Sequence, residues 1–306
     1  WVKKELDALL NEARVALESY IEDDAQTDKL ADTESKLRQV NGTLQMVELH
    51  GAALLAEEMV RLTQAVRDGS VTSRDDAFEV LMRAILQLPD YLEHIQTGHR
   101  DIPIVLLPLL NDLRTTRNAS LMSENVLFFP DMEGIMDRDE GETEVRPSGE
   151  DIRELARRSR HHYQLGLLGL FRNRDVPQSL QRIQSVIADL RRAARDDAVR
   201  RLFWVGGAVA EALGSGALEP SDTVKQLLGR IDREMRVLIQ DGESALGARI
   251  PGDLIKNLLY YVARSRPGGE QVGAVKRAFR LNELLPEGAD LEEALANIRG
   301  PNQELM

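Results

Sequence analysis

Apolar residues recur every three or four positions through most of the chain, and this spacing constrains the fold more than any other feature. Over residues 1–21 the intervals run four, three, four, three and four, at Val2, Leu6, Leu9, Ala13, Ala16 and Tyr20. This is the period of an amphipathic helix with one buried stripe, whereas a half-buried strand alternates every second residue. We find no such alternation along the sequence, so the pattern predicts an all-α fold.

Residues 1–122 are predicted to form a first helical bundle. Ser73 is a suitable N-cap for one of its helices, because Asp75 and Asp76 follow it and favour the helix dipole. Pro89 interrupts that helix. Short loops between successive helices are typical of an up-and-down bundle. The helical stripes of this half are residues 1–21, 28–46, 52–66, 73–95 and 102–113, the last interrupted by Pro103 and Pro108.

The composition changes at residues 123–149, where glycine, proline and acidic residues replace the helical pattern. We predict an acidic, partly disordered linker there, although Val126–Phe129 is apolar enough to pack against a bundle. Residues 150–306 are predicted to form a second bundle with extra helices at its C-terminal end. Its helical stripes are residues 151–172, 177–195, 198–213, 221–246, 252–263, 271–282 and 290–299.

Charge and composition exclude several classes of function. Lysine and arginine number 39 against 51 acidic residues, a formal net charge of −12, which argues against broad binding to nucleic acids or anionic membranes. There is no cysteine, and only five histidines are available as metal ligands. We find neither an apolar run of about 18 residues nor a signal peptide. We therefore expect a cytoplasmic protein with no cofactor and, because the chain begins with Trp1, a piece of a longer protein.

No spacing in the sequence indicates catalysis. There is no phosphate-binding loop and no nucleophile elbow. Glu57 and Glu58 are adjacent, so on a helix they diverge by about 100° and do not form a carboxylate pair. Four glycines inside helical stripes are expected to mark close helix–helix approach rather than a ligand site, namely Gly166, Gly169, Gly206 and Gly207.

The second half is rich in arginine and contains the only adjacent histidines, His161 and His162. We interpret the histidines as part of a polar helix face rather than a metal or phosphoryl site. The arginines are interpreted as a solvated face paired with acids of the same bundle, with an acidic partner or the acidic linker as the alternative. The candidates for binding such a partner are Arg157, Arg158, Arg191 and Arg192.

Residues 37–59, LRQVNGTLQMVELHGAALLAEEM, resemble a histidine phosphotransfer (Hpt) domain. Such domains carry His-x-x-Lys-Gly, a small residue, and an apolar run that leads into a helix rich in leucine and alanine. Gly42 and Thr43 match the glycine and the small residue, which puts Asn41 at the lysine and Arg38 at the phosphoryl-accepting histidine. A guanidinium does not accept a phosphoryl group as an imidazole does. The resemblance therefore implies a degenerate Hpt-type bundle that folds but does not relay phosphoryl groups.

Further segments resemble the N-terminal region of the CheA-type hybrid histidine kinases (ChpA/PilL-like) of the Pil–Chp chemosensory system, which controls type IV pili and twitching motility. The same two-bundle unit is similar to the FimL-type scaffold proteins of that pathway, which lack a kinase core. The resemblance implies that both bundles are of the Hpt type. It also implies a CheY-like response regulator and polar pilus-assembly scaffold proteins as partners, with a location at the cell pole. The segments are residues 40–48, 51–59, 163–169, 203–208 and 253–263.

We accordingly predict a non-catalytic docking region of a chemosensory two-component protein. The candidate binding faces are those around Arg38, Asn41 and Gln45 and around the arginines of the second bundle. Two alternatives remain open. One is an active phosphotransfer domain that uses His50 or His162, and the other is a dimerisation or spacer module.

Overall fold

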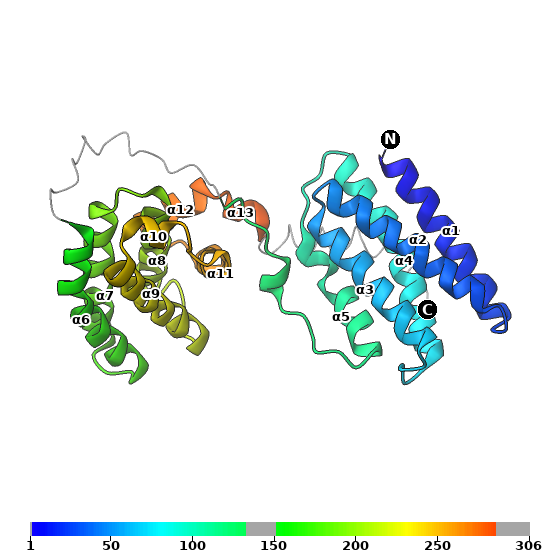
Figure 1. The fold of residues 1–306 in the computed structure, drawn as a ribbon, viewed down its shortest axis with the longest axis horizontal. Helices are drawn as coiled ribbons and strands as arrows, with labels where there is room; N and C mark the ends of the chain where they lie inside the picture. Colours follow the sequence, from blue (N-terminus) through cyan, green and yellow to red (C-terminus); the bar gives the residue numbers. More distant parts are fainter. Residues whose placement is uncertain (1, 133–150, 286–306) are drawn as a thin grey trace. The chain divides into compact units, whose positions relative to one another are not determined.

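The computed structural model describes residues 2–132 and 151–285 (Figure 1). Every regular element in these residues is helical, with thirteen α-helices and two 3-10 helices and no strand. The prediction of an all-α fold is confirmed. The described residues divide into two compact units: the first holds residues 2–129 with 283–285, and the second holds residues 130–282.

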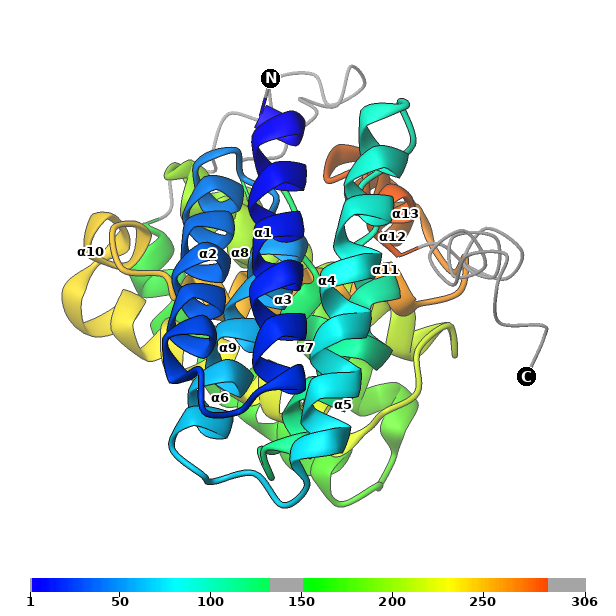
Figure 2. The same ribbon diagram turned by 90° about the vertical axis from the view of Figure 1, so that its right-hand side faces the viewer.

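The first unit is built on four long helices connected in sequence. In Figure 2, α1 lies between α2 and α4, with α3 behind it. Helices α1, α2, α3 and α4 each contact their neighbours along the chain, and α1 also contacts α4, which closes the bundle. The elements are α1 (Val2–Glu22), α2 (Thr27–Met46), α3 (His50–Arg67), α4 (Arg74–Gln96), η1 (Pro103–Leu106), α5 (Leu107–Thr116) and η2 (Glu124–Leu127).

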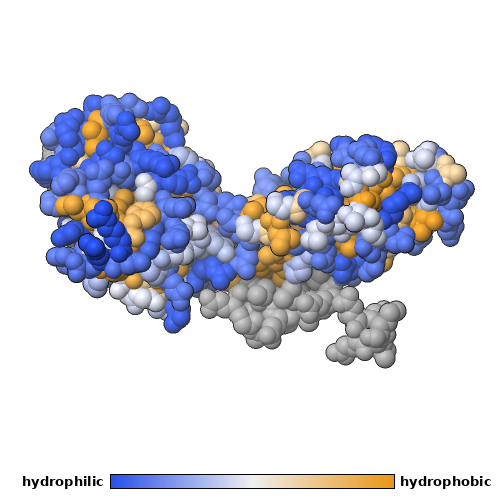
Figure 3. Space-filling model, turned by 90° about the horizontal axis from the view of Figure 1, so that it is seen from below, coloured by the Kyte–Doolittle hydropathy of each residue, from blue (hydrophilic) through white to orange (hydrophobic). Residues whose placement is uncertain are grey.

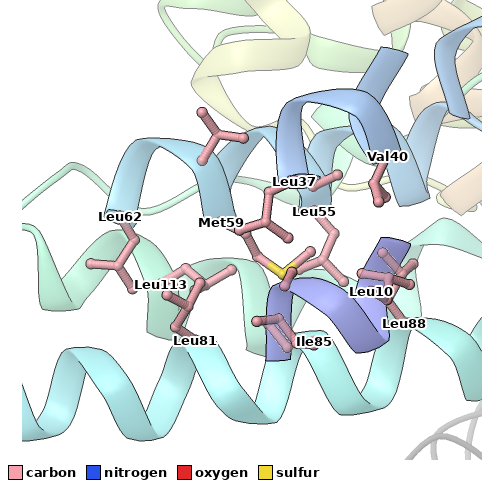
Figure 4. Packing of buried hydrophobic residues seen from close by; sticks show 14 of the residues in the cluster. Leu10, Leu37, Val40, Leu55, Met59, Leu62, Leu81, Ile85, Leu88 and Leu113 are labelled. Atoms are coloured by element: carbon pink, nitrogen blue, oxygen red, sulfur yellow. The ribbon is translucent and has the colours of Figure 1, made fainter. Parts of the chain in front are cut away.

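The core of this unit is aliphatic. Figure 4 shows side chains from several helices that meet in one cluster: Leu10, Leu37, Val40, Leu55, Met59, Leu62, Leu81, Ile85, Leu88 and Leu113. Fully burying a leucine stabilises the folded state by about 1.5–3 kcal/mol, so this cluster holds α5 against the bundle as well as the four long helices together. The sequence stripes predicted the helices whose residues fill this core.

Contrary to the sequence prediction, the prolines of the first unit do not interrupt its helices. Pro89 lies inside α4, which continues from Arg74 to Gln96 without a break. Proline removes one backbone hydrogen bond, and burial of Leu88 and Leu92 on either side of it outweighs that loss. Pro103 begins the short helix η1, and α5 follows it directly with proline in its first turn, a position that tolerates the missing N–H.

The first unit extends beyond the predicted boundary at residue 122. Leu127 is buried in its core, and Phe129 packs against that core. The apolar residues at the start of the predicted linker therefore belong to the first unit, because burying them removes apolar surface from water. Residues 133–149 of the predicted linker lie outside the described part of the chain.

The second unit places α7 between α6 and α8 and sets α9 against α6, while α11 and α12 pack on α8. Its elements are α6 (Ile152–Phe171), α7 (Val176–Ala193), α8 (Asp197–Gly214), α9 (Asp222–Asp241), α10 (Glu243–Gly247), α11 (Gly252–Arg264), α12 (Glu270–Ala278) and α13 (Leu281–Leu284), the last of which continues past residue 282. The prediction of a single helix over residues 221–246 is wrong. The chain forms two helices that are separated at Gly242, whose φ of 91° is incompatible with an α-helix. The apolar spacing nevertheless continues across this break to the buried Leu246. The helix predicted over residues 290–299 lies outside the described residues.

Glycines bring helices of the second unit close together, as the sequence predicted. A Cβ at Gly166 would lie 2.7 Å from the backbone oxygen of Ser179 on α7. A Cβ at Gly206 would lie 2.6 Å from Ile231 on α9, and one at Gly207 would lie 2.4 Å from Gln271 on α12. A side chain at Gly166 would require the neighbouring backbone to shift, and one at Gly206 or Gly207 would require the Ile231 or Gln271 side chain to move, so these positions are packing contacts.

Among the described residues, no helix combines the length and the apolar character that crossing a membrane requires.

Candidate functional site

The residues predicted around the degenerate Hpt motif lie on α2. Arg38 and Gln45 are seven positions apart, which is about two helical turns, so they project from the same side of the helix with Asn41 between them. Both are exposed, and the Arg38 side chain is 57% accessible to solvent. Asn41, Gly42 and Thr43 are half-buried. The structure thus brings Arg38, Asn41 and Gln45 onto one side of α2.

A buried carboxylate on α2, which the sequence did not single out, holds Arg38. Glu34 accepts hydrogen bonds from Nε and Nη2 of Arg38, at 3.0 and 2.8 Å, and from Gln64 on α3, at 2.9 Å. Arg67 on α3 also pairs with it. Burial alone would raise the pKa of Glu34, but the bonds from Arg38 and Gln64 and the charge of Arg67 outweigh it, so the pKa is lowered.

We call the side of α2 formed by Arg38, Asn41 and Gln45 the α2 face, which carries a cation and two amides. The Asn41 oxygen Oδ1 is buried without a hydrogen-bond partner. At the end of the helix, Met46 is 83% exposed, and Val47, the residue after it, is 38% exposed.

Glu58 is the second buried carboxylate of this unit, and the sequence did not indicate it either. Its Oε1 lies 2.6 Å from Nη1 of Arg114 on α5, and its Oε2 lies 2.5 Å from Nη2 of Arg117. Arg61 on α3 pairs with the neighbouring Glu57 and also lies 3.3 Å from Oε1 of Glu58, so the two carboxylates share this arginine although only Glu58 is buried. Because Arg114 and Arg117 are 56 and 59 residues from Glu58 in sequence, local spacing does not indicate these two partners.

His50, one of the two alternative phosphoryl acceptors, is exposed at the first turn of α3. Its ring lies 5.1 Å from that of Phe129. The half-buried Asp101 accepts a hydrogen bond from the Tyr91 hydroxyl. Burial raises the pKa of Asp101, while this bond and the nearby His50 act in the opposite direction.

His162, the other alternative, is exposed on α6, and its ring lies 6.3 Å from that of His161. The lysine position of an Hpt motif in this frame is occupied by Leu165, which is exposed. Within the described residues, no three histidine or acidic side chains are grouped so that they could hold a metal ion.

The arginines predicted in the second unit do not form one face. Arg157 on α6 pairs with Glu154, and Arg192 on α7 pairs with Asp189. Arg191 points to the other side of α7, where its guanidinium lies 5.2 Å from the Trp204 ring centroid on α8. Arg158 is exposed on α6. Ion pairs within the same unit thus account for Arg157 and Arg192.

Comparison with known proteins finds similarity to a scaffold protein. The family model described as the FimL C-terminal domain matches residues 1–107, and that described as the FimL scaffold protein second domain matches residues 148–292. Over 305 residues, all of this chain, it is 33% identical to the scaffold protein FimL of Pseudomonas aeruginosa. The chain is similar to FimL scaffold proteins.

The similarity to FimL has a defined extent. The chain spans 53% of the length of the Pseudomonas aeruginosa protein. No solved structure matches. The expected similarity to scaffold proteins of the FimL type is confirmed, whereas the similarity to a hybrid kinase remains a prediction.

Proposed function

We propose that this chain is a non-catalytic docking region of a FimL-type scaffold in chemosensory two-component signalling that controls type IV pili and twitching motility. The observation that carries the proposal is the 33% identity to a protein named as a scaffold, which extends over the whole chain. Both units are then Hpt-type bundles that bind without relaying phosphoryl groups. The protein acts in the cytoplasm, at the cell pole, beside pilus-assembly scaffold proteins.

The α2 face is the proposed docking surface for a CheY-like response regulator. An active Hpt domain would need an imidazole at the position of Arg38, and α2 contains no histidine. The two hydrogen bonds that Arg38 donates to Glu34 fix its guanidinium without burying it. A guanidinium held in this way can bind a carboxylate or phosphate of a receiver domain in a defined geometry.

Phosphotransfer through His50 or His162 is the rival function. Neither histidine stands in a His-x-x-Lys-Gly motif. His50 lies beside Phe129 at the start of a helix, and His162 lies on α6. Phosphotransfer also requires groups that position an aspartyl phosphate in line with the imidazole, and exposure of the histidine does not supply them.

Calorimetric titration of the whole chain with CheY-like regulators, phosphorylated and unphosphorylated, tests the docking proposal. We expect saturable binding that Arg38→Ala weakens by about tenfold, roughly 1.4 kcal/mol. Arg14→Ala is the matched control, since Arg14 also forms an i,i+4 pair, with Glu18, but on α1. Equal losses in the two variants, or no binding to any regulator, would contradict the α2 face as the dock.

Radiolabel transfer separates docking from catalysis. With labelled phosphoryl supplied by an active CheA-type kinase, we expect no label on the chain. Label that disappears in His50→Gln or in His162→Gln would establish the rival function instead.

A further inference from the structure

The exposed large apolar side chains of the second unit gather on one helix. Among its described residues they are Leu165, Leu168 and Phe171, which are 38, 45 and 48% exposed. All three lie on α6, at intervals of three positions. Each interval turns the helix by about 300°, so the three side chains fall within about 120° of one another. In the first unit the exposed apolar residues are spread over several elements instead.

This apolar stripe lies in the most basic stretch of an acidic chain. Residues 152–175 contain six arginines, Arg153, Arg157, Arg158, Arg160, Arg172 and Arg174, against two acids, Glu154 and Asp175. The stretch therefore has a formal charge of +4, whereas the whole chain has −12. Arg158 and Arg172 are exposed, and each is seven positions from Leu165. They therefore lie in line with Leu165, about two helical turns before and after it.

The neighbouring helix α9 leaves the stripe uncovered. Helices α6 and α9 run antiparallel, because Arg160 pairs with Asp232 and the Tyr163 hydroxyl bonds to the backbone oxygen of Leu228. Leu165, Leu168 and Phe171 nevertheless remain 38, 45 and 48% exposed. The surface in Figure 3 is largely hydrophilic with separate hydrophobic areas.

We infer that the stripe Leu165–Leu168–Phe171 with Arg158 and Arg172, here called the α6 face, binds an acidic amphipathic helix of a partner protein. An amphipathic helix presents apolar residues at the same three- and four-residue intervals as the stripe. Acidic residues beside those anchors complement Arg158 and Arg172, the two exposed arginines in line with the stripe. The inference deepens the proposed scaffold function, since it gives one docking surface a partner of defined chemistry.

The size of the face favours a helix over a second copy of the chain. Three side chains, each about half exposed, offer on the order of 200–300 Å² of apolar surface. A stable dimer buries about 800 Å² on each partner. A single helix inserts only a few apolar anchors, so the face is large enough for one.

Three fluorescein-labelled peptides test the inference by fluorescence anisotropy with the whole chain. The first peptide has 18 residues, with leucine at helical intervals and glutamate or glutamine elsewhere. The second has the same composition with the leucines spread around the helix, and the third has lysine in place of glutamate. We expect saturable binding of the first peptide, at least tenfold tighter than that of the other two, and weaker binding at higher salt.

Surface variants then locate the binding face. The double variant Leu168→Gln/Phe171→Gln should weaken binding of the first peptide at least tenfold. Leu86→Gln, which changes an exposed leucine of α4 in the first unit, should not. Arg158→Gln/Arg172→Gln should weaken binding and reduce its salt dependence, whereas Lys4→Gln on α1 should leave both unchanged. If the double leucine–phenylalanine variant loses helicity by circular dichroism, Leu165→Gln alone provides the same test.

Several results would overturn the inference. One is equal binding of the first and second peptides, and another is equal losses in Leu168→Gln/Phe171→Gln and Leu86→Gln. A third result is that the chain sediments with vesicles made of equal parts phosphatidylglycerol and phosphatidylcholine. If that sedimentation is lost in Leu168→Gln/Phe171→Gln, the face binds a membrane. A dimer that Leu168→Gln/Phe171→Gln dissociates would assign it to a second copy.

Failure of this inference is distinguishable from failure of the proposed function. The receiver titration depends on Arg38 in the first unit, whereas the peptide titration depends on α6 in the second. Receiver binding without peptide binding would remove only the α6 face, and the converse would remove only the α2 face.

Discussion

Removing the Glu58 carboxylate should loosen α5 far more than removing its neighbour Glu57. Both oxygens of Glu58 are bonded to arginines that reach it from the C-terminal part of the first unit, Arg114 and Arg117. The Glu58 side chain is only 2% exposed. The substitution Glu58→Ala would leave two guanidinium groups facing a buried space without a counter-charge.

The magnitude follows from the exposure of the partners. Breaking a buried ion pair by removing one member costs about 3–5 kcal/mol. The Arg114 and Arg117 side chains are 16 and 19% exposed, so water reaches them in part after the substitution. We therefore expect a loss of about 2–3 kcal/mol in the free energy of opening α5. Since about 1.4 kcal/mol is a factor of ten, amides of α5 should exchange ~30- to 160-fold faster.

Hydrogen exchange followed by mass spectrometry measures this effect segment by segment. Glu57→Ala is the matched control, because it places alanine in the same helix and breaks only a surface pair with Arg61. Exposed pairs are worth about 0–1 kcal/mol, so α5 should exchange less than ~5-fold faster in that variant. Helix α9 of the second unit should not change in either protein. Equal exchange of α5 in the two variants would refute the reasoning, since desolvation would then cancel the attraction in the cluster.

Three further predictions concern pH and packing. Because the pKa of Glu34 is lowered, its ionised form stabilises the first unit above the ordinary pKa of 4.5. Glu34→Gln should therefore lower the stability of this unit at pH 7 but not in acid, as measured by hydrogen exchange of α2. Because the pKa of Asp101 is raised, ionisation of this carboxyl lowers the stability of the folded unit above the ordinary pKa of 3.8. Asp101→Asn should therefore stabilise the first unit slightly at pH 7 but not below pH 3.8, as measured by urea denaturation at both pH values. Gly166→Ala should destabilise the second unit by about 1–3 kcal/mol through overpacking, whereas Gly229→Ala, which meets no atom within 4 Å, should stabilise it by up to about 1 kcal/mol, both read from urea denaturation.

The sequence predicted those features that depend on neighbouring residues. The helical period located α1, α2 and α3 within a few residues, and glycines inside helical stripes marked the close contacts at Gly166 and Gly206. It did not reveal the break at Gly242, because the apolar spacing runs through a residue with positive φ. Glycine has that conformation available in any context, so its presence alone does not indicate a break.

The candidate sites divide in the same way. Helical spacing alone was enough to put Arg38 and Gln45 on one side of α2. The carboxylate that holds Arg38 also contacts Gln64 and Arg67, and the partners of Glu58 come from α5 and the residue after it. Such clusters depend on which helices lie side by side, and a single sequence carries no direct signal for that. The exposed stripe on α6 has the apolar period of a buried face, so the sequence did not distinguish it from core.

The contacts of Glu34 have a consequence for phosphoryl relay by a histidine placed at position 38. Replacing Arg38 with histidine would supply an acceptor, but it would also remove two of the hydrogen bonds to a largely buried carboxylate. A neutral imidazole would then stand one helical turn from that anion, which favours the protonated ring, and a protonated ring has no lone pair for attack on an aspartyl phosphate. Phosphoryl relay at position 38 would therefore require a coordinated change, with Glu34 also replaced by a neutral residue. The single substitution Arg38→His should make the bundle less stable and leave it unable to accept a phosphoryl group.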